Sequence, residues 1–296
     1  MSIVGFVQLQ ETTINSIKQA ILKSLDLINF SFAKETKSVA IKPNMAYYWD
    51  YSTGQTTDPK FVGALIDVIR EEVSSNVRIS IVESDASAMK CKYAFPLLGY
   101  KQLAEQYKVD LVNLTEDKSE NVQITVNGHD FDLPVPRTIQ EADLRINIPK
   151  IKYIDAIRVS SGMKNIFGCN PIPEKYKFHP LLNETIVALN KIMKFDLHIL
   201  DGIILLGTFP RRLNLVMAST DPVAFDAATY KISGENPRKS KCITLAKKEG
   251  LGDIQYLSRG IDPAVFEKNF PKKKFSDKFV AGVYALAVEI GIFRKG

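Results

Sequence analysis

Short apolar runs alternate with segments of helical periodicity along most of this chain. Residues 13–27 carry apolar side chains at the three- and four-residue spacing of an amphipathic helix, and the apolar run 3–9 precedes them. The same alternation returns with 39–41 and then the helical pattern of 59–72. Strands that alternate with helices favour βαβ units, so we predict an α/β fold with mostly parallel sheets and flanking helices.

Turn and cap residues divide these elements. Asp58-Pro59 and Asp221-Pro222 each mark a helix start, because Asp is a preferred N-cap and Pro suits the first helical position. Asn127-Gly128 lies within the alternating residues 121–137 and indicates a tight hairpin, which needs positive φ. A polar loop is expected at 152–165. The other predicted strands are 77–82, 109–114, 144–148, 197–206 and 213–218, with helical stretches before about 107, at 181–193 and at 223–230.

The chain is long enough to bury a full core, and no low-complexity linker divides its 296 residues. We expect one α/β body over residues 1–296, built as two α/β lobes of about 1–115 and 116–296 with a cleft between them. The segment 231–296 is expected to form short, basic helices on the outside of this core.

The net charge of +6 is concentrated near the C-terminus. Residues 231–296 hold 14 Lys and Arg against 7 Asp and Glu, with Lys272-Lys273-Lys274 at the centre of the excess. A solvated basic face explains this segment most simply, and a contact with RNA or an acidic protein surface is the alternative. No zinc finger or aromatic–basic pattern supports nucleic-acid recognition.

Cysteine use and hydropathy indicate a cytoplasmic protein with no membrane partner. We find no secretory leader and no apolar run of the roughly 18 residues that a membrane span requires. The three cysteines are far apart, which fits a reducing compartment and excludes an internal ferredoxin-type cluster. Cys169 follows Gly168 directly, and a buried, inert thiol is favoured there over a reactive one.

Three lysines lie at predicted junctions between a strand and the loop that follows it. In an open α/β sheet, ligands bind in the crevice outside the carboxyl ends of the strands, so these cations are expected to converge on an anion. A lysine holds a phosphate or carboxylate as a point charge, or moves a proton once burial lowers its pKa. A solvated surface cation is the alternative for any one of them. They lie in Ile41-Lys42-Pro43-Asn44, Asn147-Ile148-Pro149-Lys150 and Gly162-Met163-Lys164-Asn165-Ile166-Phe167-Gly168.

Threonines and acids accompany these lysines. Thr56 and Thr57 precede the expected N-terminus of a helix, where free N–H groups and the helix dipole favour anions. Asp201 lies inside an apolar run and needs a partner, for which an ion pair with a lysine is the natural candidate. Asp221 could face the same crevice, but a helix cap is favoured. Glu83 could be catalytic, metal-binding or capping, and capping is favoured there too.

Two further patterns were weighed. The three histidines are scattered through the chain, so no metal site is predicted. Residues 45–52 include Tyr47, Tyr48, Trp49 and Tyr51. This aromatic loop could cover an organic ligand or contact another protein.

Taken in order, these segments resemble the domain-of-unknown-function family 362 of bacteria and archaea. Members are often joined to ferredoxin-like iron–sulfur modules, so the resemblance implies a redox or cofactor-assembly partner of an iron–sulfur protein as one role. The third lysine loop is also similar to nickel-dependent lactate racemases, which implies a two-lobed α/β body with a cofactor between the lobes. The matching pieces are Ile41-Lys42-Pro43-Asn44, Thr56-Thr57-Asp58-Pro59, Ala142-Asp143, Asn147-Ile148-Pro149-Lys150, residues 162–169, Asp201-Gly202-Ile203 and residues 218–224.

The chain departs from the family pattern at three places. Family members usually have histidine where Asp58 stands here and a second histidine at about Ile154. A Gly-x-Gly-Pro stretch is replaced by residues 207–212, in which Arg211 and Arg212 could add anion-binding charge. If the histidines bind a metal or move protons in relatives, this chain has lost or reassigned that capacity.

We therefore expect an enzyme, or a protein derived from one, that binds a small anionic substrate or unspecified cofactor between the lobes. Lys164 is the expected proton-transfer group, with Asp201 as its partner. A non-catalytic module that contacts RNA or protein through the basic segment 231–296 is the alternative. The expected ligand-binding residues are Lys42, Asn44, Thr56, Thr57, Asp58, Lys150, Asn165 and Asp221.

Overall fold

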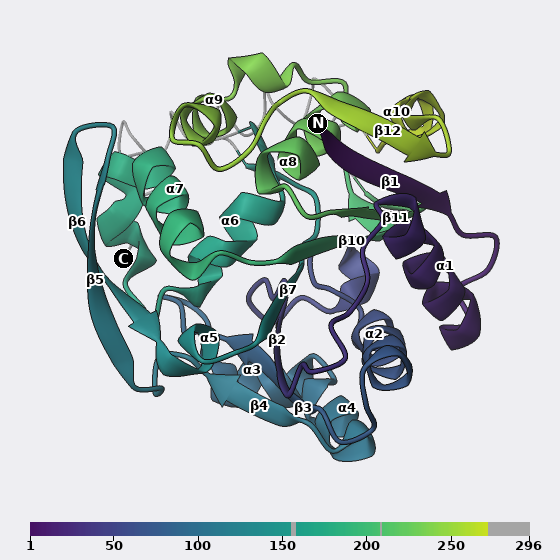
Figure 1. Cartoon of the computed structure of the whole chain (residues 1–296), viewed down its shortest axis with the longest axis horizontal. Coiled ribbons are helices and arrows are strands. Elements are labelled where there is room, and N and C mark those ends of the chain that lie inside the picture. Colours follow the sequence, from purple (N-terminus) through teal and green to yellow (C-terminus); the bar gives the residue numbers. More distant parts are fainter. Residues whose placement is uncertain (155–157, 208, 272–296) are drawn as a thin grey trace, which may run out of the picture.

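The computed structural model describes residues 1–154, 158–207 and 209–271 and is built around one eight-stranded sheet (Figure 1). The strand order is β12-β1-β11-β10-β7-β2-β3-β4, and only β11 runs antiparallel to its neighbours within this sheet. The strands are β1 (Ser2–Gln8), β2 (Ser38–Pro43), β3 (Arg78–Glu83), β4 (Asp110–Asn113), β7 (Leu144–Ile148), β10 (Leu197–Leu206), β11 (Pro210–Ser219) and β12 (Tyr256–Gly260).

Helices cover both faces of the sheet, and each face buries its own apolar core. One core is formed with α1 (Ile14–Leu27), α2 (Pro59–Glu72), α3 (Cys91–Leu97) and α4 (Tyr100–Tyr107). The other is formed with α6 (Gly162–Ile166), α7 (Leu182–Met193), α8 (Pro222–Ile232), α9 (Lys241–Lys248) and α10 (Pro263–Asn269). The predicted α/β class, with a mostly parallel sheet and flanking helices, is confirmed. The sheet contains strands from both 1–115 and 116–296, and their division into two lobes stays a prediction.

The caps and turns explain why these elements begin and end where they do. The Asp58 side chain accepts from the Lys60 N–H at 2.8 Å, with Pro59 in the first turn of α2. Asn127 and Gly128 have φ of 53° and 79°, which joins β5 (Ser119–Val126) to β6 (His129–Pro136) as a tight hairpin. This hairpin packs on α7.

Three elements differ from the sequence-based expectation. The helical stretch before residue 107 is broken into α3 and α4 by Gly99, whose φ of 82° cannot continue a helix. The expected polar loop at 152–165 contains a hairpin of β8 (Lys152–Ile154) and β9 (Arg158–Ser160), followed by α6. The C-terminal segment supplies β12, because parallel pairing with β1 overrides a sequence with little strand character. Lys272-Lys273-Lys274 lies outside the described residues.

The connections of the sheet define where a ligand site should lie. From β2 the chain passes through α2 to β3 on one side, whereas from β7 it passes through α6 and α7 to β10 on the other. The adjacent strands β2 and β7 therefore form a topological switch point, and a crevice opens at their carboxyl ends. None of the helices in the described parts of the chain is long and apolar enough to cross a membrane.

The docking of β12 can be tested at Gly260. This residue has a φ of 88°, and an added Cβ would lie 2.2 Å from the Phe6 carbonyl oxygen. We expect Gly260→Ala to lower the free energy of unfolding by about 1–3 kcal/mol more than Gly128→Ala, because overpacking adds to the backbone cost. Gly128 has a similar φ of 79° but no atom within 4 Å of an added Cβ, so it is a matched control. Equal losses in urea unfolding of the two variants would contradict this packing.

Candidate functional site

A pocket of about 450 Å³ lies at the carboxyl ends of β2 and β3. Four lysines and one glutamate are the charged residues that the described part of the chain contributes to its lining, and we call it the lysine pocket. The loop after β2, the loop after β3, α6 and the segment that follows α6 enclose it. Its lining includes Lys42, Asn44, Tyr47, Glu83, Ser84, Lys152, Lys164, Asn165, Gly168, Lys175 and Tyr176.

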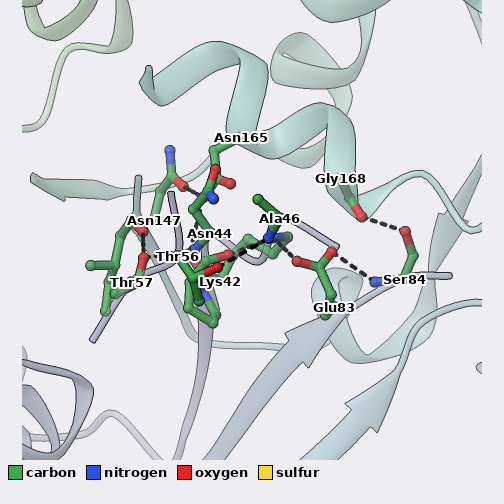
Figure 2. A network of polar contacts seen from close by, with 12 residues as sticks. Lys42, Asn44, Ala46, Thr56, Thr57, Glu83, Ser84, Asn147, Asn165 and Gly168 are labelled. Carbon is green, nitrogen blue, oxygen red and sulfur yellow. Dashed lines mark hydrogen bonds and ion pairs between the residues drawn. The ribbon is translucent and has the colours of Figure 1, made fainter. Parts of the chain in front are cut away.

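Lys42 and Glu83 form a buried ion pair in the lysine pocket (Figure 2). The Lys42 Nζ donates to Glu83 Oε2 at 2.8 Å and to the Pro43 carbonyl oxygen at 2.6 Å. The other Glu83 oxygen accepts from the Ser84 N–H at 2.9 Å. Gly168 passes close to this pair, since an added Cβ would lie 3.2 Å from Lys42 Cε and 3.3 Å from Glu83 Oε1. The glycine therefore lets the end of the α6 segment approach the charges.

Two lysines in the pocket, Lys152 and Lys164, have neither a carboxylate nor a hydrogen-bond acceptor as partner within the described residues. The Lys164 Nζ lies 4.1 Å from the centroid of the Phe167 ring, and burial lowers the pKa of Lys164 to about 8. Lys152 is partly buried. Desolvation, followed by the positive charges of Lys164 and Lys42, lowers the pKa of Lys152 to about 7. Both amines therefore exchange protons near neutral pH.

Lys175 closes the other side of the pocket. Its Nζ donates to Ser84 Oγ at 2.9 Å and to the Asn170 carbonyl oxygen. The Ser84 hydroxyl in turn donates to the Gly168 carbonyl oxygen (Figure 2). Burial lowers the pKa of Lys175 to about 8. Lys175 is thus held in place by neutral oxygens.

Buried polar groups position the short helix α6. The Asp226 carboxylate accepts from the N–H groups of Gly162 and Met163 at 2.7 and 3.2 Å, and its burial raises its pKa to about 7. Asn165 donates to Asn147 Oδ1 at 2.7 Å, the contact drawn in Figure 2. Lys164 and Asn165 are therefore fixed from two sides.

Asn147 extends this network into the sheet. Its amide donates to the Gly162 carbonyl oxygen at 2.8 Å and lies 3.0 Å from His198 Nδ1. Burial lowers the pKa of His198 to about 3, so the ring is neutral and accepts at Nδ1. The histidine therefore positions Asn147 and is not a proton-transfer group near neutral pH.

The predicted threonines hold the loop after β2. The Thr57 hydroxyl accepts from the Asn44 N–H at 2.9 Å and donates to the Ile148 carbonyl oxygen at 2.8 Å. Thr56 bridges the Ala46 N–H and the Trp49 carbonyl oxygen within the same loop. Both hydroxyls are buried and already paired, so they orient Asn44 toward the pocket and do not line it.

Lys150 and Asp201 form a second buried ion pair, behind the lysine pocket. Their charged atoms are 3.2 Å apart, and both side chains are 1% exposed. Asp201 also accepts from the Asp58 N–H at 2.9 Å, which links the pair to the start of α2. Burial lowers the pKa of Lys150 and raises the pKa of Asp58. Asp201 is thus the partner of Lys150 rather than of Lys164, the partner expected from the sequence.

Asp221 lies at the opposite edge of the sheet. Because β11 runs antiparallel to β10, its carboxyl end pairs with the beginning of β10, as His198 opposite Ser219 shows. The Asp221 carboxylate accepts from the N–H groups of Val223 and Ala224 at 2.8 and 2.9 Å as the cap of α8. It therefore does not face the lysine pocket.

Sequence reasoning missed Lys152 and Lys175 and favoured capping for Glu83 over a catalytic or metal-binding role. The alternation in Lys150-Ile151-Lys152 was a usable signal, because it places two lysines on one face of an extended segment. Lys175 lies in a 3₁₀ turn and carries no local signal. Tyr47 and Tyr176 are exposed at the pocket and line it.

Other candidates lie outside the lining of this pocket. Arg211 and Arg212 are exposed on β11. Cys169 is buried, which raises the pKa of its thiol to about 12. Within the residues that the structure describes, no three or more His, Cys, Asp or Glu side chains are grouped to hold a metal ion.

The fold and site define an α/β protein whose lysine-lined pocket lies at the carboxyl edge of a mostly parallel sheet. The family described as "Domain of unknown function (DUF362)" matches residues 39–231, and the chain belongs to this family. The matched range includes Lys42, Glu83, Lys164 and Lys175.

One relative in sequence and one solved structure resemble most of the chain. The "Thylakoid-associated protein sll1697" of Synechocystis is 25% identical over 254 residues, which cover 81% of this chain and 74% of that protein. The lactate racemase apoprotein from Thermoanaerobacterium thermosaccharolyticum is a structural neighbour with a TM-score of 0.46 and 10% identity. That match covers 76% of this chain and 56% of the racemase chain. The sequence resemblance named the same class of racemase, and no functional inference follows from so distant a likeness.

The ion pair behind the pocket should be a stability element. We expect Lys150→Met to lower the free energy of unfolding by about 3–5 kcal/mol, because it leaves Asp201 buried without a counter-charge. The double variant Lys150→Met/Asp201→Asn should lose clearly less, because the uncompensated charge is gone. Urea unfolding of both variants measures the difference. A single-variant loss below about 1 kcal/mol, the range of exposed pairs, would contradict this role.

Proposed function

We propose that this protein is an enzyme that binds a small anionic substrate in the lysine pocket and uses Lys164 for proton transfer. The observation that carries the proposal is the imbalance of charge in the pocket, where four lysines face one glutamate. Buried like charges repel one another, which raises the free energy of keeping each lysine charged. A bound carboxylate or phosphate group would lower that free energy. Asn44 and Asn165 line the same space and supply amide groups to orient the ligand.

Lys164 fits the proton-transfer role for two reasons. No carboxylate pairs with its Nζ in the described part of the chain, and its pKa of about 8 lies close to neutral pH. A general acid or base works best when its pKa is near the working pH. Lys42 differs, because Glu83 and the Pro43 carbonyl oxygen already hold its proton donors.

Three other expectations stay predictions. A cytoplasmic location, a contact with RNA or protein through the basic segment, and a role beside an iron–sulfur protein have no described contact in their support. The Synechocystis relative is named as thylakoid-associated, and the proposal is compatible with a protein that works near a membrane surface.

Sulfate is a suitable probe for the pocket, because it remains a dianion throughout the pH range in which proteins are stable. We expect Lys164→Met to weaken sulfate binding by about tenfold or more, since a hydrogen bond to a charged group contributes about 1.5–3 kcal/mol. The melting temperature without ligand should be nearly unchanged, because the variant removes a buried, unpaired amine. Isothermal titration calorimetry and thermal unfolding measure the two quantities.

Lys23→Met is the matched control for this experiment. Lys23 is exposed on α1, outside the pocket lining, so its loss should leave sulfate affinity unchanged. Equal affinities of the wild-type and Lys164→Met proteins would refute the binding role. A collapse in the stability of Lys164→Met would instead identify Lys164 as a structural residue.

The pH dependence of binding follows from the lowered pKa values. Sulfate affinity should fall as pH rises from about 7 to 9, because Lys152, Lys164 and Lys175 lose protons at pKa values of about 7, 8 and 8. The same lysines should make the free energy of unfolding of the ligand-free protein rise as pH increases over this range. In the unfolded chain they keep the ordinary pKa of 10.5 and bind more protons than in the folded protein. Affinity that rises with pH in titrations at several pH values would contradict the assignment.

A further inference from the structure

The four lysines of the pocket differ in what holds them. Lys42 is in an ion pair with Glu83, and Lys175 donates to two neutral oxygens. Lys164 lies over the Phe167 ring, an arrangement that favours the charged amine. Lys152 has neither a carboxylate nor an aromatic ring as partner within the described residues. The positive charges of Lys164, Lys42 and Lys150 act on it, and the charge of Glu83 opposes them only in part. Its environment is therefore the one that most favours a neutral amine.

A neutral amine beside cations has a specific chemical use. Desolvation and neighbouring positive charge both lower the pKa of a lysine, and this activates its amine as a nucleophile toward a carbonyl carbon. Burial lowers the pKa of Lys152 to about 7, so near neutral pH a large fraction of this amine carries a free electron pair. The other lysines remain more fully protonated and can hold an anionic group of the same molecule.

We propose that Lys152 is a nucleophile that captures a 2-oxo acid as a Schiff base in the lysine pocket. The inference rests on the proposed anion-binding function and adds the substrate class and the bond that forms. The substrate carboxylate would contact the protonated lysines, which places the adjacent carbonyl carbon beside the remaining amine. A pocket of about 450 Å³ is within the range of small-molecule sites.

The step balances without an oxidant or a reductant. The Lys152 nitrogen attacks the carbonyl carbon, and the electron pair of the C=O bond moves to oxygen, giving a carbinolamine after proton transfer. Loss of that oxygen as water, with one proton from nitrogen and one from an acid, leaves the C=N bond. Lys164 is suited to donate the proton that turns the leaving hydroxyl into water and to take a proton back from the Schiff-base nitrogen, because its charge acts directly on Lys152.

Glu83 limits which charge the substrate can carry. Among the described residues it is the one acidic residue in the lining of the pocket, and Lys42 neutralises it at 2.8 Å. With Lys152 neutral as the nucleophile, Lys164 and Lys175 remain as cations for the ligand, which favours a substrate with one or two negative charges over a neutral ketone. Charge therefore separates pyruvate from acetone as test compounds, since both carry a methyl ketone of similar size.

Reductive trapping tests the proposal. The full-length protein is incubated with pyruvate and sodium cyanoborohydride, and adducts are measured by intact mass and located by peptide mapping. We expect one adduct for each chain, on Lys152, with at least tenfold less labelling by acetone. Lys152→Met and Lys152→Arg should lose the adduct, whereas Lys23→Met should retain it. Labelling of the wild-type protein should rise as pH increases through about 7, as the amine loses its proton.

Two measurements keep the outcomes distinct. The melting temperatures of the Lys152 variants show whether each is folded, so loss of the adduct in a folded Lys152→Arg protein supports the nucleophile. An adduct located on Lys164, or spread over exposed lysines as in urea-unfolded protein, overturns it. Sulfate binding without any pyruvate adduct overturns the Schiff-base proposal and leaves anion binding intact. Absence of both sulfate binding and adduct refutes the two proposals together.

Discussion

The burial of positive charge at one edge of the sheet is the constraint on which the site depends. Lys42 and Lys150 end up 1% exposed, and each survives there because a carboxylate lies within 3.2 Å. Removing a charge from water costs several kcal/mol unless a partner and further hydrogen bonds offset it. Glu83 and Asp201 meet that requirement from β3 and β10, on the two sides of β2 and β7. The two paired lysines stabilise the edge of the sheet that forms the crevice. The other lysines of the pocket have no carboxylate partner among the described residues and are available for a ligand.

The paired and unpaired lysines differ in backbone setting. The paired ones belong to strand ends, where Pro43 and Pro149 restrict the chain beside them. Lys164 belongs to a five-residue helix that is too short to be stable alone, so Asp226, Asn147 and the end of β2 position it from outside. This arrangement separates two tasks. Lys42 and Lys150, which hold the sheet edge together, are buried, whereas Lys164 is carried by a segment that is fastened at several points.

How far the sequence alone could go depended on whether the signal was local. Strand and helix periodicity, the Asp-Pro caps and the Asn-Gly turn are local, so most elements and the α/β class were predictable. Lys42 and Lys164 were recognised as pocket residues because proline or glycine beside them gave them context. Asp221 is the helix cap that its sequence context favoured, but the expectation that it also binds the ligand did not allow for strand direction, which is a property of the whole sheet. β12 and Lys175 depended on partners far away in the chain, which no local pattern encodes.

The fastening of α6 has a consequence for the order in which the molecule is assembled. Its contacts join residues that are 18, 64 and 123 positions apart, from Asn165 to Asn147, from Gly162 to Asp226 and from Asn165 to Lys42. Contacts between segments this far apart cost loop-closure entropy that contacts within a helix do not, so we expect them to form later than the helices. Helices and neighbouring strands can therefore be present before the pocket exists. A chain that has regained its helices is then not yet a competent protein, because the pocket exists only when distant segments have come together.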